Sequence, residues 1–446
     1  MRKIRINKVA VILITVGFCT FVQIAYGETD ALDPKSMTAP ENSPFSLKDY
    51  TGDLWTRPYL LGDWCDERNE LAKKGIIFET ELTQVFQGNT RGGKNTSGAW
   101  GYSGSVDYWL KFDTQRMGLW PAGLITIHGE TIFGNSPFSS VGAIMPVNLD
   151  AILPQPNPGL TTLSEVYLTQ FFSEEFGIIV GKVNPMDLAD NNVFANNERT
   201  QFFNTAFRGN PALFLYAPYT CMMASFTYLP NDWLTISAFA ADNNGSVTRS
   251  GFDTVFHSPK GTTLGTEWEF KVKPWELDGH QRFGVGYSNK NFTKLKQDPR
   301  TIIPPGGSGT ATDDSDYVVW YNFDQYLYAE EDDPTQGVGI FGRYGYTTGE
   351  VNPIQGFYSL GVGGKGICQG RDNDTFGLGY YYVDLSDDLP GILGVSSEQG
   401  VELFYNFEIA KSIHITPDIQ WIIDPGAGFE GRDNALVLGL RLQMSF

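Results

Sequence analysis

Apolar and polar residues alternate along most of the chain after residue 75. In the last segment, every second residue from Leu436 to Phe446 is apolar, whereas Arg441 and Gln443 lie between them. A period of two places successive side chains on opposite faces of an extended strand. The pattern predicts about sixteen strands, at 75–87, 104–113, 122–132, 162–172, 176–184, 221–229, 233–242, 262–273, 281–292, 317–329, 337–347, 356–364, 373–384, 399–411, 412–423 and 436–446.

The connections between these segments differ in length according to their order along the chain. Those after even-numbered strands are mostly brief, and those after odd-numbered strands are mostly long. An up-and-down membrane barrel has short turns at one rim and long loops at the other. Such a sheet must close because lipid offers no hydrogen bonds to its edges, and sixteen strands leave an aqueous channel. The fold class predicted is therefore an all-β transmembrane antiparallel barrel. The long connections are 88–103, 133–161, 185–220, 243–261 and 293–316.

The residues before the barrel divide into three segments. Residues 1–27 combine a basic start, an apolar core and a small-residue cleavage site, which predicts a secretory signal peptide. A membrane anchor is the alternative, since the apolar stretch approaches spanning length. Residues 28–56 lack any period and predict a flexible leader. Residues 57–74 have apolar positions at helical spacing, with Pro58 near the start and Gly75 after the end, which predicts one short amphipathic helix.

Composition and charge narrow the class of protein further. Cleavage after Gly27 leaves 28 Lys and Arg against 51 Asp and Glu, so the chain would repel nucleic acid. The chain has 50 Gly, 31 Phe, 21 Tyr and 10 Trp, a mean hydropathy of −0.21 and no second long apolar run. The missing run excludes a helical membrane protein, and the rest fits a membrane barrel. A secreted β-sandwich or propeller has a similar composition.

The cysteines and histidines do not suggest a structural framework. Cys65, Cys221 and Cys368 would remain after cleavage, and an odd number allows at most one disulfide. Their spacing to the histidines does not match a zinc site. We expect no metal and no cofactor.

Three stretches of the chain have detailed and distinctive sequences. They are 60–76, 181–211 and 399–446, and the last is the most specific, with two strands around a tight turn, an Asp-Pro-Gly loop and a terminal strand that ends in Phe446. These stretches resemble the carbohydrate-selective porin family of Gram-negative outer membranes, the OprB type. The resemblance implies a monomeric sixteen-stranded sugar channel whose terminal Phe446 is read by the outer-membrane insertion machinery. Cys65-Asp66-Glu67 departs from the family's pattern, which leaves the role of the N-terminal helix open.

The candidate solute contacts lie in one loop and on one face of the strands. A connection as long as 185–220 is usually functional or disordered, and its amides, acids and aromatic rings suit sugar hydroxyls and the apolar faces of sugars. Folded inward, it would narrow the channel; the alternative is a surface loop. The candidates in it are Asp187, Asp190, Asn191, Asn192, Phe194, Asn196, Asn197, Glu198 and Arg199. Alternation along the strands adds, as channel-facing candidates, Trp109, Trp320, Glu165, Arg282, Arg343, Asp418 and Arg441.

These observations predict passive diffusion of saccharides through an outer-membrane channel. Opposed arginines and carboxylates across a pore favour polar, uncharged solutes. The alternatives are a general diffusion porin with cation preference and a secreted soluble carbohydrate-binding protein. Catalysis is not expected. GVGGKG at 361–366 matches a nucleotide-binding pattern but lacks its strand-helix frame and predicts a tight turn, and His128 with Glu130 on one strand does not make a triad.

Overall fold

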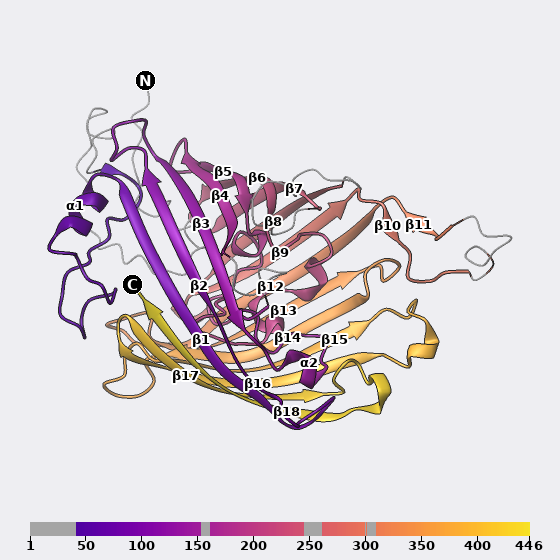
Figure 1. Ribbon diagram of the computed structural model, residues 1–446. Helices are drawn as coiled ribbons and strands as arrows, with labels where there is room; N and C mark the ends of the chain where they lie inside the picture. The colour runs from indigo at the N-terminus through magenta and orange to yellow at the C-terminus, as the bar shows by residue number, and fades with distance from the viewer. Residues whose placement is uncertain (1–41, 153–160, 245–260, 299, 301–308) are drawn as a thin grey trace.

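A single antiparallel sheet closes on itself in the computed structural model, which describes residues 42–152, 161–244, 261–298, 300 and 309–446 (Figure 1). Each strand pairs with its neighbours in chain order, and the last pairs with the first, which completes a closed sixteen-stranded barrel. The strands of the barrel are β1 Ile76–Gly93, β2 Trp100–Asp113, β3 Gly123–Gly134, β4 Thr161–Phe171, β5 Phe176–Val183, β6 Cys221–Asn231, β7 Leu234–Asp242, β8 Thr262–Val272, β9 Gly279–Ser288, β12 Asp316–Ala329, β13 Gly337–Thr347, β14 Ile354–Lys365, β15 Thr375–Leu385, β16 Ser397–Ala410, β17 Ile413–Ile423 and β18 Asp433–Ser445.

The predicted fold class is confirmed, and each of the sixteen predicted segments corresponds to one of these strands. Two details differ. Strand β1 continues to Gly93 instead of ending near 87, because the glycines and polar residues after 87 still pair with β18. A further two-stranded sheet, β10 Phe292–Thr293 with β11 Thr312–Asp313, lies in the loop after β9 and projects from the barrel at the right of Figure 1.

Helical structure is confined to short pieces. None of the helices among the described residues is long and apolar enough to cross a membrane. The α-helices are α1 Glu67–Lys73, α2 Phe138–Val141 and α3 Thr205–Arg208, and the 3-10 turns are η5 Pro185–Asp187, η6 Pro211–Leu213, η7 Pro274–Glu276, η8 Gly391–Leu393 and η9 Phe429–Gly431.

The seam between β1 and β18 closes the barrel beside the N-terminal helix. Glu81 pairs with Ser445 at one end of the seam, and the backbone N–H of Phe446 donates to the carbonyl of Thr80 at 2.7 Å. The guanidinium of Arg68 on α1 donates to the carbonyl oxygen of Phe446 at 2.9 Å and lies over the ring of Tyr50. Figure 1 accordingly shows α1 and the C-terminus at the same end of the barrel. The N-terminal segment therefore covers the closing seam.

The helix prediction for residues 57–74 needs correction, while the predicted signal peptide 1–27 and residues 28–41 of the predicted leader lie outside the described residues. The helix spans only Glu67–Lys73 instead of 57–74, because Trp64, Cys65 and Asp66 all have positive φ. A run of left-handed residues cannot belong to a right-handed helix. Gly75 follows the helix with φ of 85°, in the position predicted for it.

The leader 28–56 is not a free segment where it is described. The ring of Phe45 stacks on Phe171 at 5.4 Å, the hydroxyl of Ser43 donates to Asp113 at 2.6 Å, and Tyr50 is fully buried. Single aromatic anchors hold this segment against the barrel, and isolated anchors leave no period that a sequence pattern could detect.

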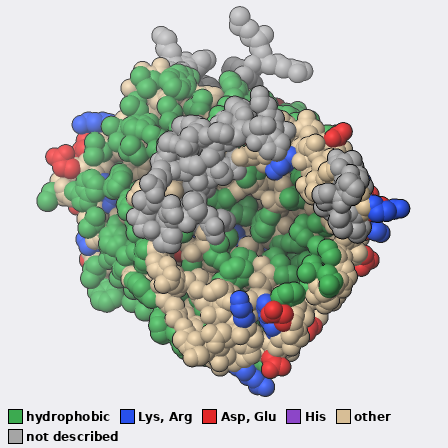
Figure 2. Space-filling view, turned by 45° about the vertical axis from the view of Figure 1, so that its right-hand side comes forward, with side chains coloured by type: hydrophobic (Ala, Val, Ile, Leu, Met, Phe, Trp, Pro, Cys, Tyr) green, Lys and Arg blue, Asp and Glu red, His purple; other side chains and the backbone are tan. Residues whose placement is uncertain are grey.

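The two faces of the barrel wall differ in chemistry as the alternation predicts. On β16, Leu403 is 47% exposed on the outer face, whereas its neighbour Glu402 is 1% exposed on the inner face. Figure 2 shows hydrophobic side chains gathered along the outer wall at the left of the view, beside a hollowed face. The three described cysteines are free thiols, and only Cys221 is buried. Large exposed side chains of the outer wall include Phe78, Phe86, Tyr108, Phe226, Phe283, Leu378, Ile419 and Leu440.

Candidate functional site

The connection between β5 and β6, residues 184–220, folds into the barrel; we call it the inward loop. Inner-wall carboxylates bind its backbone from well-separated strands. Glu402 on β16 accepts the N–H groups of Phe203 and Asn204, the latter at 3.0 Å. Glu267 on β8 accepts the N–H of Asp190 at 3.0 Å. Because these strands lie far apart around the barrel, the loop spans the channel.

Asp190 is the point at which the inward loop is most heavily bonded. The guanidinium of Arg343 on β13 donates to the carboxylate of Asp190 at 2.9 Å and to its carbonyl at 3.1 Å. The same guanidinium donates to the carbonyls of Ala195 and Phe207, at 2.6 and 2.9 Å. Asn322 on β12 adds a hydrogen bond to the Asp190 carboxylate at 2.8 Å. A buried arginine with all these partners fixes three separate parts of the loop to the wall.

A second connection also enters the barrel, which the sequence did not predict. We call residues 135–152, after β3, the second loop. The N–H of Leu149 donates to the carbonyl of Phe203 at 3.1 Å, and the N–H of Thr205 donates to the carbonyl of Pro146 at 2.9 Å. The carbonyl of Val147 accepts the amide of Gln420 on β17 at 2.8 Å. The two loops therefore brace each other against one half of the barrel.

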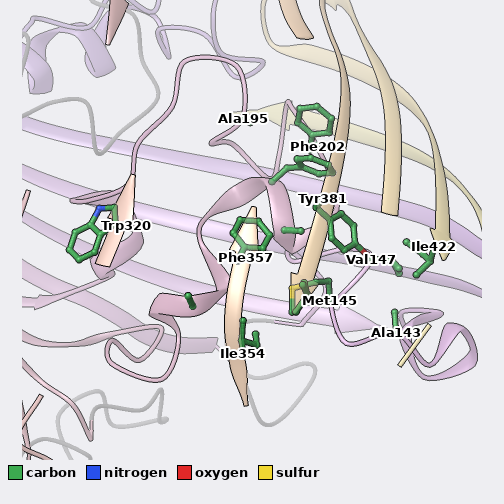
Figure 3. Packing of buried hydrophobic residues seen from close by; sticks show 14 of the residues in the cluster. Ala143, Met145, Val147, Ala195, Phe202, Trp320, Ile354, Phe357, Tyr381 and Ile422 are labelled. Carbon is green, nitrogen blue, oxygen red and sulfur yellow. The ribbon is translucent and has the colours of Figure 1, made fainter. Parts of the chain in front are cut away.

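An apolar cluster fills the space between these loops and the wall formed by β12 to β18. Figure 3 shows Met145 and Val147 of the second loop and Phe202 of the inward loop close to Tyr381 of β15. The ring of Phe202 stacks on Phe207 at 4.3 Å. Burying aromatic rings inside a channel removes that volume from the passage and stabilises the loops that carry them.

Glycines in the wall make room for the phenylalanines of the inward loop. A Cβ on Gly363 would lie 2.7 Å from the Cβ of Phe194, and one on Gly379 would lie 2.4 Å from the ring of Phe207. This packing corrects the interpretation of GVGGKG as a tight turn. Residues 361–365 continue strand β14, and the glycines are required by the close approach of rings.

A polar hollow remains on the opposite side of the barrel, between the two loops and the end of the wall near β3. About 280 Å³ around it is free of atoms, and this figure includes space that is open to the channel. Its lining is Glu130 of β3, Leu149 and Asp150 of the second loop, and Asn184, Met186, Glu198, Arg199, Arg208 and Tyr219 of the inward loop.

Two arginines project beside this hollow, and both are held by carboxylates. Arg199 donates from Nη2 to Asp107 on β2 at 2.8 Å, and its guanidinium lies 5.4 Å from the centre of the Trp109 ring. Arg208 donates from Nε to Glu198 at 2.6 Å and also pairs with Asp187. Burial would raise the pKa of Glu198, but Arg208 and Arg199 outweigh it and hold that pKa below its usual value. Both guanidinium groups therefore have fixed positions.

Two carboxylates of the hollow form no direct ion pair among the described residues, although His128 lies beside Glu130 and Arg199 acts on Asp150. Glu130 accepts the hydroxyl of Tyr219 at 2.7 Å through Oε1, and Asp150 accepts the hydroxyl of Ser105 at 2.7 Å through Oδ1. Their other oxygens meet no donor at hydrogen-bonding geometry. Burial raises the pKa of Asp150 to about 7, with Asp107 adding to the effect and Arg199 opposing it.

The neighbouring Asp107, His128 and Glu130 place ligand-type atoms within 4.8 Å of one another. Nδ1 of His128 is 2.8 Å from Glu165, and Nε2 is 3.0 Å from Asp107, so both ring nitrogens are already engaged. The carboxylate of Asp107 also accepts a hydrogen bond from the guanidinium of Arg199. We therefore interpret this group as a hydrogen-bonded charge network across β2, β3 and β4.

Of the site residues predicted from sequence, Glu198 and Arg199 line the hollow. The others serve nearby contacts. Asp187 pairs with Arg208, Glu165 with His128, and Trp109 stacks on the His128 ring at 4.6 Å. The amides hold the inward loop to itself or to the wall: Asn191 with Asn196, Asn192 with Asn322, and Asn197 with the N–H of Arg199.

The remaining predicted residues lie on the inner wall or against it. Arg441 donates to the carbonyls of Glu198 and Gln201. Trp320 donates to Glu267 at 2.6 Å, and Arg282 pairs with Asp324 at 2.6 Å. Asp418 accepts the side-chain amide of Gln420, Asp190 is the anchor point described above, and Phe194 packs against Gly363 of β14. The candidates predicted from sequence did not include Asp150, Arg208 and Tyr219. The only sequence signal for them was their place in the long connections 133–161 and 185–220.

Comparisons with known proteins agree with this geometry. A family model described as carbohydrate-selective porin, OprB family, matches residues 97–446. Porin B of Pseudomonas aeruginosa is 23% identical over 424 residues, covering 87% of this chain and 91% of that protein. A putative porin, QuiX, of Acinetobacter baylyi is 23% identical over 443 residues, covering 88% and 95%. The high-pH structure of Pseudomonas putida OprB matches with a TM-score of 0.77 at 20% identity, covering 89% of this chain and 100% of that chain.

The family match extends over most of the barrel, and the solved structure shares its fold. The family match indicates a channel of the Gram-negative outer membrane. The chain therefore belongs to the OprB family of carbohydrate-selective porins.

Proposed function

We propose that the polar hollow is the constriction at which this porin selects saccharides. The observation that carries the proposal is the inward loop, which spans the channel and is bonded to β8, β13 and β16. A loop fixed at so many points narrows the passage permanently. The solute must then pass between the loop and the opposite wall, where the polar side chains converge.

The lining suits a molecule with several hydroxyl groups. Arg199 and Arg208 offer N–H donors, Glu130 and Asp150 offer acceptor oxygens, and Tyr219 can do both. Paired charges of opposite sign on facing surfaces favour polar solutes without a net negative charge. The arginines already form ion pairs with carboxylates. A sugar hydroxyl therefore only replaces a water molecule as a hydrogen-bond partner of these side chains. The contacts are then weak enough for release, which conduction requires.

Sugar-dependent block of the channel current tests this function. We expect purified protein in planar bilayers to conduct ions, and we expect added glucose or maltose to reduce that current in a concentration-dependent way. Proteoliposomes should also swell in isotonic glucose. Unblocked, cation-preferring current with equal swelling for all small solutes would instead show a general diffusion porin. Recovery of the protein without any channel activity would contradict both.

The charge of Asp150 predicts a pH-dependent ion selectivity. Because its pKa is raised to about 7, this carboxyl is mostly neutral at pH 6 and mostly charged at pH 8. The charged groups that act on it are Arg199 and Glu198 of the inward loop, Asp107 of β2 and Arg441 of β18. We expect the K⁺/Cl⁻ permeability ratio, measured as a reversal potential in a KCl gradient, to rise about twofold over this range.

The Asp150→Asn variant separates this effect from that of the other buried carboxyls inside the barrel that titrate in the same range. Burial also raises the pKa of Asp187 to about 7, although Arg208 opposes the shift. The variant should lose the part of the rise that is due to Asp150 and retain the part due to the other carboxyls, Asp187 among them. A wild-type ratio that stays constant, or falls with increasing pH, would contradict the assignment.

We also propose how the outer surface and the chain end are used. The exposed apolar band of the wall suits contact with outer-membrane lipid. The terminal Phe446 is the residue that the barrel insertion machinery would recognise. A Phe446→Ala chain that reaches the outer membrane in wild-type amounts would contradict the second statement.

A further inference from the structure

Residues 43–59 lie against the barrel wall at the rim with the short turns, where Figure 1 also places α1 and the C-terminus; we call them the N-terminal collar. The hydroxyl of Ser43 donates at 2.6 Å to Asp113, the last residue of β2. The ring of Phe45 stacks at 5.4 Å on Phe171, the last residue of β4. The first part of the collar therefore follows this rim across neighbouring strands.

The second part of the collar is held at the start of β1. The ammonium of Lys48 lies 3.4 Å from the carboxylate of Glu79, and the hydroxyl of Tyr59 donates to the same carboxylate. Tyr50 is fully buried in a small apolar cluster with Ile77 of β1. Charged, polar and apolar contacts thus fix the collar at well-separated points, which a segment that only trails from the barrel would lack.

The wall residues that hold the collar are on the inner face of the barrel. On β1, Glu79 alternates in phase with Gln87, whose amide donates to the second loop at 3.0 Å. On β2, Asp113 alternates in phase with Asp107, which accepts Arg199 of the inward loop at 2.8 Å. Both loops lie inside the barrel, so the collar lies inside its mouth and not on the outer wall.

The collar lies next to the polar hollow along the channel. Glu81 is the next inner residue of β1 after Glu79, about 7 Å further along the strand. Nε of Arg199, which lines the hollow, is 3.8 Å from Glu81. The side chains of Glu81, Lys48 and Lys111 are 30%, 23% and 15% exposed, and at this place their exposed surface faces the channel. A charged inner surface therefore continues from the hollow to the collar.

We propose that the collar is a fixed second constriction of the channel, at the rim with the short turns, and that Lys48 is a channel-facing residue that determines ion selectivity there. Glu79 accepts Lys111 of β2 at 2.7 Å as well as Lys48 of the collar. The collar thus contributes a cation beside the carboxylates of Glu79 and Glu81. Without that cation, the mouth would favour cations and disfavour anions. The inference does not depend on which solute the hollow selects.

Reversing the charge of Lys48 tests its position in the channel. We expect Lys48→Glu to raise the K⁺/Cl⁻ permeability ratio about threefold, measured as a reversal potential in a KCl gradient. The current should also become asymmetric with voltage, because the new charge lies at one end of the channel. Lys73→Glu is the control, since Lys73 on α1 is 54% exposed and pairs with Glu70. A wild-type ratio and current-voltage curve in Lys48→Glu would overturn the role of Lys48.

Thiol modification tests the constriction without a change in the folded chain. The protein would carry Lys48→Cys, with the exposed Cys65 and Cys368 replaced by Ser and the buried Cys221 retained. Attaching an ethyltrimethylammonium group should restore the wild-type permeability ratio, and attaching an ethylsulfonate group should raise the ratio. Both groups add volume, so both should lower the conductance, whereas Lys73→Cys in the same background should keep it. Unchanged conductance after complete modification at position 48 would show that the collar leaves the mouth open and would overturn the proposal.

Discussion

Replacing Arg343 with Met is expected to free the inward loop and to raise single-channel conductance several-fold. The side chain of Arg343 is fully buried and joins Asp190, Ala195 and Phe207 to β13. Methionine keeps much of the volume but supplies no donor. Removing one partner of a buried ion pair costs about 3–5 kcal/mol, because the remaining charge is left uncompensated. That cost falls on the loop, since the strands of the wall keep their own pairing.

The same variant should lose sugar selectivity together with its narrow passage. We expect glucose to block the current less, and larger oligosaccharides to enter liposomes that the wild type excludes. Arg300→Met is the control, because Arg300 is 89% exposed and its ion pair with Asp298 contributes little at the surface. Wild-type conductance and block in an Arg343→Met protein that folds and inserts would show that this anchor does not hold the loop.

The barrel could be predicted from the sequence because its signal is repeated. Each strand alternates between an outer apolar face and an inner polar face, as Leu403 and Glu402 illustrate, and each repetition strengthens the assignment. Loop lengths added the direction of each strand. The N-terminal segment lacked such repetition. Its helix is shortened by positive φ values at 64–66, and a binary pattern of apolar and polar residues does not report backbone handedness.

The contents of the channel were predicted less well, for a physical reason. Alternation shows that Arg343 and Arg441 point inward, but not that a loop lies over them. The amides of the inward loop suit a sugar as well as they suit a neighbouring backbone, so residue type alone could not separate solute contacts from anchors. Asp150 was missed because the second loop enters the barrel only through contacts with the inward loop and the wall, and such long-range pairing leaves no local pattern.

Placing a methyl group on Gly363 is expected to have the opposite effect on the passage. A Cβ at this position of β14 would lie 2.7 Å from the Cβ of Phe194. The contacted atom is next to the loop backbone, so rotating the ring does not relieve the clash. Overpacking of this kind costs about 1–3 kcal/mol, and we expect the inward loop to shift rather than the strand, because β14 is paired with neighbours on both sides. Gly363→Ala should therefore push the loop away from β14 toward the hollow and lower the conductance.

A second substitution distinguishes displacement of the loop from general damage to the barrel. Phe194→Gly removes both the Cβ that clashes and the ring that Gly363 accommodates, so the double variant with Gly363→Ala should recover most of the wild-type conductance. Gly391→Ala is the control, because a Cβ there meets no atom within 4 Å. If Gly363→Ala conducts as the wild type does, or if Phe194→Gly does not restore the conductance, the packing of Phe194 against β14 does not set the width of the channel. If both results are as expected, the glycines of the wall determine the position of the inward loop as directly as the charged anchors do. Arg343→Met would then raise the conductance and Gly363→Ala would lower it. Opposite changes from these two variants would show that the inward loop controls the width of the passage.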